Sequence, residues 1–148
     1  MNDPQVTVRA ARAGDAPALA ALATELGYPS ETARIAVRLR GLLAGADDVV
    51  FVAVADGAQI VGFVHAAEKR LLVSEPFVEL EGLIVAAAAR RQGAAGLLVE
   101  AVEAWTRERG VGELRVRARL ERDVADRFYR RCGFELEKEQ RVFIKPLA

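Results

Sequence analysis

The spacing of apolar and polar residues divides this chain into segments of two kinds. Four segments carry helix signals, such as apolar residues three or four positions apart, a capping residue before the first turn, or a glycine after the last. Asp15 and Ser30 stand where they can cap the first two helices. The predicted helices are Ala16–Leu26, one between Ser30 and Gly45, Ala94–Arg109 and Arg122–Arg131.

The other apolar segments are shorter and favour strands. Gln5–Ala10 alternates, which suits a strand with one buried face. Val49–Ala55 and Gln59–Ala67 flank Asp56–Gly57, a dipeptide typical of hairpin turns. Further extended segments are predicted at Leu71–Val73, Phe77–Val85, Glu113–Ala118 and Phe134–Lys145. This order predicts helices packed on a mixed, twisted sheet, an α/β (α+β) fold.

Composition narrows the class of protein. The 148 residues fit one domain, 1–148, with 52% hydrophobic and 28% charged residues. Lys plus Arg and Asp plus Glu both number 21, so no global field attracts nucleic acid or a membrane. The lone Cys132 excludes an internal disulfide. Because neither a signal peptide nor an apolar run of about 20 residues is found, we expect a cytoplasmic domain.

Small side chains and positive charge meet at one predicted helix start. Ala86–Ala89 come first, and the residues after them are Arg90, Arg91, Gln92, Gly93, Ala94, Ala95 and Gly96. The first amides of a helix lack internal partners and carry partial positive charge, so small residues there let an anion approach. One interpretation is a phosphate or pyrophosphate cradle. The other is a tight strand–helix connection with solvated arginines.

Other phosphate-binding motifs fit this stretch less well. The chain contains neither G-x-x-x-x-G-K-[ST] nor G-x-G-x-x-G with an acidic ribose partner. Gly93–Gly96 matches the GXXG of KH-type RNA-binding loops, but such a loop should lie between helices of a basic domain. Here a strand precedes it and the net charge is zero, so we expect no nucleic-acid partner.

Two motifs resemble those of the GNAT superfamily of N-acetyltransferases. Arg90–Ala95 matches the signature [QR]-x-x-G-x-[GA], and Ala125–Phe134 is similar to a later A-x-x-F-Y-x-x-x-G-F segment. The usual Asn of that segment is Arg122 here, so its contact to the cofactor is open, and an Arg could reach a phosphate instead. The resemblance spans nearly the whole chain. It implies a GNAT-type sheet of about six to seven strands flanked by about four helices.

The resemblance also implies a cofactor and its site. In this family the cradle amides bind the pyrophosphate of acetyl-coenzyme A, and the preceding strand pairs with its pantetheine arm. The implied cofactor-binding residues are Leu83, Ile84, Val85, Arg90, Arg91, Gln92, Gly93, Ala94, Ala95 and Gly96.

Acetyl transfer to an amine needs a base for the amine and a proton donor for the departing thiolate. Glu79 and Glu81 lie two apart on one predicted strand and so share a face, although a solvated face would show the same pattern. The resemblance implies Glu79 as the base. Glu81 resembles the acidic residue that aminoglycoside N-acetyltransferases present to cationic substrates, and the two roles could be exchanged. Tyr129 matches the family tyrosine near the coenzyme sulfur and is the implied catalytic acid; packing beside Phe128 is the alternative.

Several further residues are candidates for substrate binding. His65, the only histidine, could relay a proton or shape the acceptor pocket, and Tyr28 lies where family members contact the acceptor. Both could equally be structural. Arg115, Arg117 and Arg119 alternate, which we interpret as a solvated face balanced by Glu121 and Asp123; a coenzyme phosphate or a partner subunit are the alternatives. With one His and one Cys, no metal site is expected.

These observations predict an N-acetyltransferase that moves an acetyl group from acetyl-coenzyme A to a primary amine of a small cationic acceptor, by direct transfer in a ternary complex. The alternatives are a non-catalytic acyl-coenzyme A binding module and acetylation of a protein lysine or N-terminus. The sequence does not identify the acceptor, and it leaves open whether the protein forms a homodimer. No membrane partner is expected.

Overall fold

The computed structural model describes residues 5–119 and 123–148, which fall into two compact units, Met1–Arg117 and Ala118–Ala148. The first unit contains every described strand and the helices α1 to α4. The second contains α5 (Asp123–Arg131). The single domain expected from the chain length stays a prediction.

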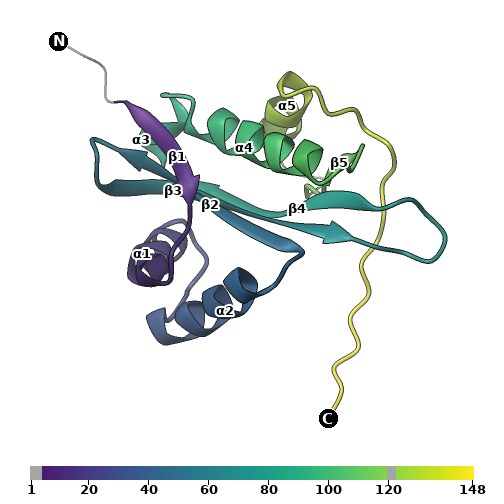
Figure 1. Cartoon of the computed structure of the whole chain (residues 1–148), viewed down its shortest axis with the longest axis horizontal. Coiled ribbons are helices and arrows are strands. Elements are labelled where there is room, and N and C mark those ends of the chain that lie inside the picture. The colour runs from purple at the N-terminus through teal and green to yellow at the C-terminus, as the bar shows by residue number, and fades with distance from the viewer. Residues whose placement is uncertain (1–4, 120–122) are drawn as a thin grey trace. The chain divides into compact units, whose positions relative to one another are not determined.

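Five strands form one sheet in the order β1–β2–β3–β4–β5 among the described residues (Figure 1). Neighbouring strands are antiparallel, except that β4 and β5 are parallel. Their bounds are β1 Val6–Ala10, β2 Asp48–Ala55, β3 Gln59–Lys69, β4 Phe77–Val85 and β5 Leu114–Val116. The mixed sheet is confirmed, with five described strands where six to seven were expected.

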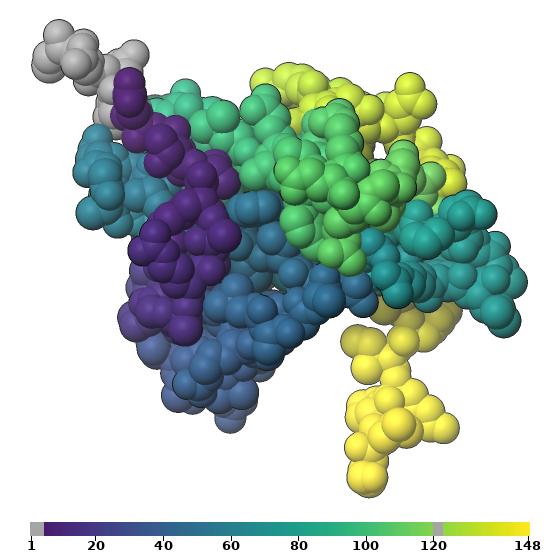
Figure 2. Space-filling view, viewed as in Figure 1, coloured from purple at the N-terminus to yellow at the C-terminus, as the bar shows by residue number. Residues whose placement is uncertain are grey.

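Helices cover both faces of this sheet (Figures 1 and 2). On one face, α1 (Ala16–Glu25) and α2 (Thr32–Ala44) pack Leu19 and Leu39 against Val50 and Val52 of β2. On the other, α4 (Ala94–Glu108) contacts β1 to β4 and contributes buried Leu98 and Val102. Two apolar layers therefore enclose the sheet.

Local signals account for several boundaries. Asp56 and Gly57 adopt positive φ angles of 51° and 82°, and this turn closes the β2–β3 hairpin as predicted. β4 has the predicted bounds. Ser30 does not cap α2: Glu31 is the N-cap residue, while the Ser30 amide donates to Thr24 Oγ1 and its hydroxyl to the Tyr28 carbonyl. The loop between α1 and α2 takes the hydrogen bonds of Ser30, so the helix starts one residue later.

Three sequence predictions differ from the structure. Leu71–Val73 lies in the turn region between β3 and β4, and Leu72 is fully exposed, because its apolar side chain has no layer to pack against. The described residues 134–145 form no strand, since no backbone ladder pairs with them there. A short helix, α3 (Ala87–Arg90), stands between β4 and α4 where a simple turn was expected.

The second unit is built around the end of α5. The Cys132 amide donates to the Phe128 carbonyl and the Phe134 amide to the Tyr129 carbonyl, and Gly133 adopts a φ of 97°. This left-handed residue closes the helix in the way that favours glycine. The Tyr129 ring stands edge-on to the Phe128 and Phe134 rings, at centroid distances of 5.3 and 5.6 Å.

Within the described residues, none of the helices combines the length and the apolar character needed to cross a membrane.

Candidate active site

One backbone edge of β4 is open beside the predicted cofactor residues. β5 pairs only with Val78–Leu80, so on that side Glu81–Val85 has no strand partner among the described residues. On the other side, Leu83 and Val85 pair with Val64 and Gly62 of β3. Free amide and carbonyl groups on such an edge can bind an extended chain that contains amides. The pantetheine arm of coenzyme A is a chain of this kind.

The open edge leads directly to the start of α4. Gly93 is the N-cap residue with a φ of 79°, and the first amide that donates back along the helix is that of Leu97, to the Gly93 carbonyl. The amides of residues 94–96 precede it and therefore lack partners within the helix. A Cβ atom added at Gly93 or Gly96 would meet no atom within 4 Å, so this helix start is sterically open. The residues present fit a pyrophosphate group.

The two arginines of the signature differ in their surroundings. Arg90 Nε donates to the Val85 carbonyl at 3.0 Å and ties α3 to the end of β4. Arg91 is exposed and follows α3 directly. Part of the signature thus holds the short helix in place, and both guanidinium groups add positive charge near the helix start.

Acidic side chains gather on the sheet face that α1 and α2 cover. His65 is directly opposite Val50, a core residue of that face, and cross-strand partners share a face. The register aligns Asp48, Ala67 and Glu79 in one row across β2, β3 and β4. Glu81 is the extra β4 residue where the β3–β4 register shifts. This bulge places Glu81 opposite the step between His65 and Ala66, two positions before Leu83, the first residue of the cofactor strand segment.

Glu79 is buried and ion-paired. Its residue is 7% exposed, and Arg117 Nε donates to its Oε1 at 2.7 Å. Arg117, which the sequence analysis assigned to a solvated face, therefore contacts the predicted base. The parallel pairing of β5 with β4 brings the two together.

Glu81 forms an ion pair with Lys69, whose Nζ lies 2.6 Å from Glu81 Oε1. This hydrogen bond raises the pKa of Lys69, and the charges of Glu81, Glu79 and Asp48 add to the effect against the cost of burial. Three carboxylates thus act on one ammonium group. The pair shows that this face already attracts a primary amine.

His65 Nε2 lies 2.8 Å from Asp48 Oδ1, and both side chains are about one quarter exposed. Because an ionised carboxylate only accepts hydrogen bonds, Nε2 donates to it. That leaves Nδ1 of a neutral ring as an acceptor. Asp48 therefore sets the orientation and tautomer of the one histidine.

The two predicted tyrosines have different local surroundings. Tyr129 is half-buried on α5 in the second unit, and burial, followed by the Cys132 thiol, raises the pKa of its hydroxyl. Tyr28 follows α1; its amide donates to the Ala23 carbonyl, and its side chain is 44% exposed. Arg122, which stands where the later family segment usually has Asn, lies outside the described residues.

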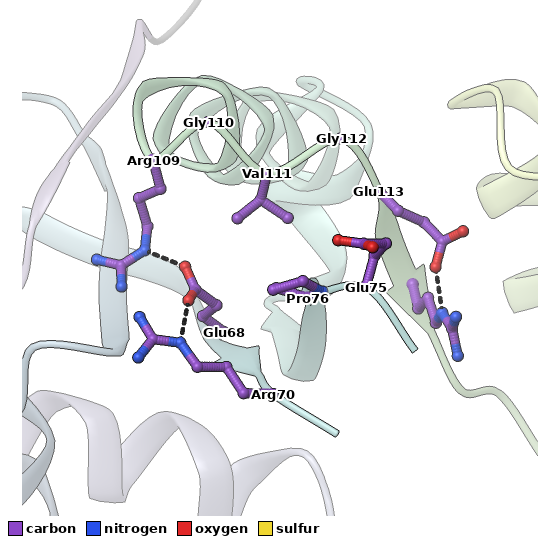
Figure 3. A pocket seen from close by; sticks show the side chains of 10 residues that line it. Glu68, Arg70, Glu75, Pro76, Arg109, Gly110, Val111, Gly112 and Glu113 are labelled. Atoms are coloured by element: carbon purple, nitrogen blue, oxygen red, sulfur yellow. Dashed lines mark hydrogen bonds and ion pairs between the residues drawn. The ribbon is translucent and has the colours of Figure 1, made fainter. Parts of the chain in front are cut away.

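The pocket shown in Figure 3 contains none of the predicted site residues. Arg109 and Arg70 bind the two oxygens of Glu68 at 2.8 Å and lower its pKa, and Arg115 pairs with Glu113. Arg109 also donates a hydrogen bond to Asp47, so this cluster holds the end of α4 against the sheet. The pocket is lined by Glu68, Arg70, Glu75, Pro76, Arg109, Gly110, Val111, Gly112, Glu113 and Arg115.

The residues that sequence reasoning missed are Asp48, Lys69 and Arg117. Asp48 and Lys69 lie one and two residues outside the predicted strand ends, Val49 and Ala67, and alternation continued outward would have placed both on the face that carries His65. Arg117 was noticed, but nothing in the sequence identifies its partner. Among the described residues, no group of three or more His, Cys, Asp or Glu side chains could hold a metal ion.

Sequence comparison finds related proteins over nearly the whole chain. The acetyltransferase (GNAT) family model matches residues 17–134. An aminoglycoside N(6')-acetyltransferase type 1 of Stenotrophomonas maltophilia is 35% identical over 145 residues, 95% of this chain and 94% of that protein. A protein of the same name from Serratia marcescens is 34% identical over 120 residues, 81% of this chain and 73% of the relative.

Structure comparison finds the same fold in solved enzymes. The aminoglycoside 6'-N-acetyltransferase AAC(6')-Ih of Acinetobacter baumannii superposes with a TM-score of 0.85 at 22% identity, covering 97% of this chain and 100% of that one. AAC(6')-Iy in complex with CoA gives 0.85 at 23% identity, covering 99% and 98%. The GNAT-type fold expected from the two motifs is confirmed.

Proposed function

The chain belongs to the GNAT family of acetyltransferases, and we propose that it moves the acetyl group of acetyl-coenzyme A to a primary amine of a small cationic acceptor. As a family member it is an acetyl-coenzyme A-dependent N-acetyltransferase. The observation that carries the choice of acceptor is the group of three carboxylates on one sheet face, Asp48, Glu79 and Glu81, of which Glu81 lies at the open edge of β4. Lys69 already places an amine against Glu81, which supports a cationic acceptor.

Aminoglycosides are the acceptor class that we favour. The Stenotrophomonas maltophilia relative bears that activity in its name and is similar over nearly its full length. Aminoglycosides carry several ammonium groups, and the sheet face with Asp48, Glu79 and Glu81 suits such a molecule. Other small amines, such as polyamines, have the same chemistry and are part of the test.

Acetyl-coenzyme A supplies the acetyl group as a thioester. The amides of residues 94–96 would hold its pyrophosphate, and the open edge of β4 at Leu83–Val85 would hold its pantetheine arm. We assign Glu79 as the base that takes a proton from the amine and Glu81 as the group that binds the cationic acceptor. Tyr129 would donate a proton to the departing thiolate, and its raised pKa supports a protonated hydroxyl at neutral pH.

The first experiment measures release of free thiol from acetyl-coenzyme A with a panel of aminoglycosides, polyamines and amino acids. Turnover of an aminoglycoside or polyamine supports the proposal, and turnover of amino acids alone contradicts the acceptor class. Initial rates should fit a ternary complex, with lines that intersect rather than run parallel. Parallel lines with acetylated protein in the mass spectrum would contradict direct transfer.

The two glutamates should differ in kinetics. Glu79→Gln should lower kcat by about 10²-fold or more, and higher pH should recover part of the rate because more amine is then deprotonated. Glu81→Gln should mainly raise KM for a cationic acceptor, since it removes attraction in the ground state. Acetyl-coenzyme A affinity should change little in both. Reversed effects would exchange the roles, and full activity of the double variant would remove both assignments.

A homodimer, and the absence of nucleic-acid and membrane partners, stay predictions. Sedimentation equilibrium with and without acetyl-coenzyme A measures the first. Fluorescence anisotropy with random-sequence DNA and flotation with lipid vesicles measure the others.

A further inference from the structure

Two ion pairs and one histidine–carboxylate hydrogen bond occupy the carboxylates of the proposed acceptor face. Asp48 pairs with His65, Glu79 with Arg117 and Glu81 with Lys69, at 2.8, 2.7 and 2.6 Å. The positive charge that a cationic acceptor would bring to this face is therefore already supplied by the chain. One of these internal cations has to give way if an acceptor ammonium is to reach a carboxylate.

Lys69 is the internal cation best able to move. Arg117 has the more exposed side chain, 62% against 39% for Lys69, but its partner Glu79 is only 9% exposed, whereas Glu81 is 29% exposed and can be solvated when its partner leaves. A lysine ammonium is a point charge on a flexible four-carbon stem, unlike the planar fork of an arginine. Exposed pairs of this kind contribute little and exchange easily. Lys69 can leave Glu81 without leaving the buried Glu79 carboxylate unpaired, because Arg117 still contacts it.

Lys69 is also unusual in the sequence. The chain has three lysines, Lys69, Lys138 and Lys145, and all its other basic residues except His65 are arginines. The one lysine before residue 138 thus lies opposite a carboxylate of the proposed site. A primary ammonium at this point has the same chemistry as the group that the enzyme is proposed to bind.

We propose that Lys69 determines acceptor specificity by competing with the acceptor ammonium for the Glu81 carboxylate. This inference rests on the proposed function of the same face. Lys69 weakens binding of every cation at Glu81, so an acceptor is held well only if a further ammonium group also reaches the partly exposed Asp48 carboxylate. Acceptors with several ammonium groups are thereby favoured over simple monoamines.

Kinetics of charge-removing variants test the competition. Lys69→Met keeps the stem and should lower KM for kanamycin and spermidine by about two- to fivefold, the range expected for one exposed ion pair. Lys69→Arg keeps the positive charge and should not lower KM. The gain should vanish in the Lys69→Met, Glu81→Gln double variant and shrink in high salt. Arg70→Met is the matched control, since Arg70 pairs with Glu68 and Asp47 instead, and its KM should not change.

Binding can be followed at Lys69 itself, apart from turnover. In protein labelled with [13Cε]lysine, three signals are expected, and Lys69→Met identifies one of them. Adding spermidine or kanamycin should move the Lys69 signal toward the position of an exposed lysine, while inorganic salt of equal ionic strength should not. Calorimetric binding of these amines with an unmoved Lys69 signal, or an unchanged KM in Lys69→Met, would overturn the proposal.

The outcomes separate this inference from the proposed function. If no amine is acetylated but spermidine still displaces Lys69 and binds Lys69→Met more tightly, the competition stands and acetyl transfer to cationic amines fails. If kanamycin is acetylated and its KM is the same in the unaltered chain and in Lys69→Met, the proposed function stands and the competition is wrong. If neither the unaltered chain nor Lys69→Met binds either amine, the competition is wrong.

Discussion

The Tyr129 hydroxyl is the single group on which proton donation to the leaving thiolate depends in the proposed mechanism. Tyr129→Phe keeps the edge-on contacts with Phe128 and Phe134, so the melting temperature should change little. The rate of acetyl transfer should fall by about 10²-fold if the hydroxyl donates the proton. Stopped-flow measurement of the chemical step checks this.

The other tyrosine provides the control for this change. Tyr28→Phe removes the same hydroxyl from an exposed side chain and should affect acceptor KM rather than kcat. A Tyr129→Phe variant with near-full kcat, when chemistry limits turnover, would assign Tyr129 to packing.

Asp15 shows how one buried carboxylate makes stability depend on pH. It accepts hydrogen bonds from both terminal nitrogens of Arg9 and from the Arg12 amide, and these bonds, Arg9 first, lower its pKa. Its contribution is present above the unfolded pKa of about 3.9 and is lost as pH falls through the lower folded value. Asp15→Asn should lower the free energy of unfolding at pH 7 by about 1–3 kcal/mol.

Urea unfolding across pH 2–7 tests this prediction for Asp15→Asn, with the loss shrinking toward acid. Asp126→Asn is the control, because its i,i+4 pair with Arg130 is half-exposed and should contribute about 0.5 kcal/mol or less. An Asp15→Asn loss of equal size at pH 2 and pH 7 would mean that packing, not the charge, is responsible.

At the scale of the element, the start of α4 can be tested by charge. Ala95 is the second residue of the helix, where an added acid favours the helix dipole, so Ala95→Glu should fold normally. The same carboxylate would stand where pyrophosphate oxygens are expected and should weaken acetyl-coenzyme A binding by tenfold or more, about 1.4 kcal/mol. Isothermal titration calorimetry measures the affinity.

A neutral variant separates the effect of charge from that of size. Ala95→Gln has nearly the same volume as Ala95→Glu and should weaken binding much less. Equal losses in both would indicate a steric effect alone. Unchanged affinity in a folded Ala95→Glu protein would exclude the cradle.

At the scale of the whole molecule, Arg109 joins segments that lie far apart in the sequence. From the end of α4 it donates to the Ala46 carbonyl, Asp47 and Glu68, each at 2.8 Å, and its guanidinium stacks on Trp105. Arg109→Met would leave the largely buried Glu68 carboxylate with fewer donors. The free energy of unfolding should fall by about 1–3 kcal/mol in urea titrations at pH 7.

Arg107→Met on the same helix is the matched variant. Arg107 is 76% exposed and has one 3.8 Å contact to Glu103, so its loss should change stability by about 0.5 kcal/mol or less. Equal effects of the two substitutions would show that Arg109 contributes only as a surface charge.

Much of the fold was predictable because the signals are local. Phe77–Val85 has the predicted bounds, and the hairpin at Asp56–Gly57 follows from residues that tolerate a positive φ. The predictions were wrong where contacts with another segment set the boundary of an element. Thr24 binds Ser30 and shifts the start of α2, and residues 134–145, although patterned as a strand, find no described ladder to join. A pattern specifies which face of a segment is apolar but not which backbone lies beside it.

The sequence by itself determined the family, the mixed sheet with helices packed on it, and the small residues at the start of α4, since these follow from local patterns and short motifs. Only the tertiary structure decided what the charged groups contact. Arg117 reaches Glu79 because β5 runs parallel to β4, and Lys69 reaches Glu81 because a bulge shifts the β3–β4 register. The residues of such pairs are up to 38 positions apart in the sequence. The attraction between two charges depends on the distance between them, and the sequence does not give this distance until the chain is folded.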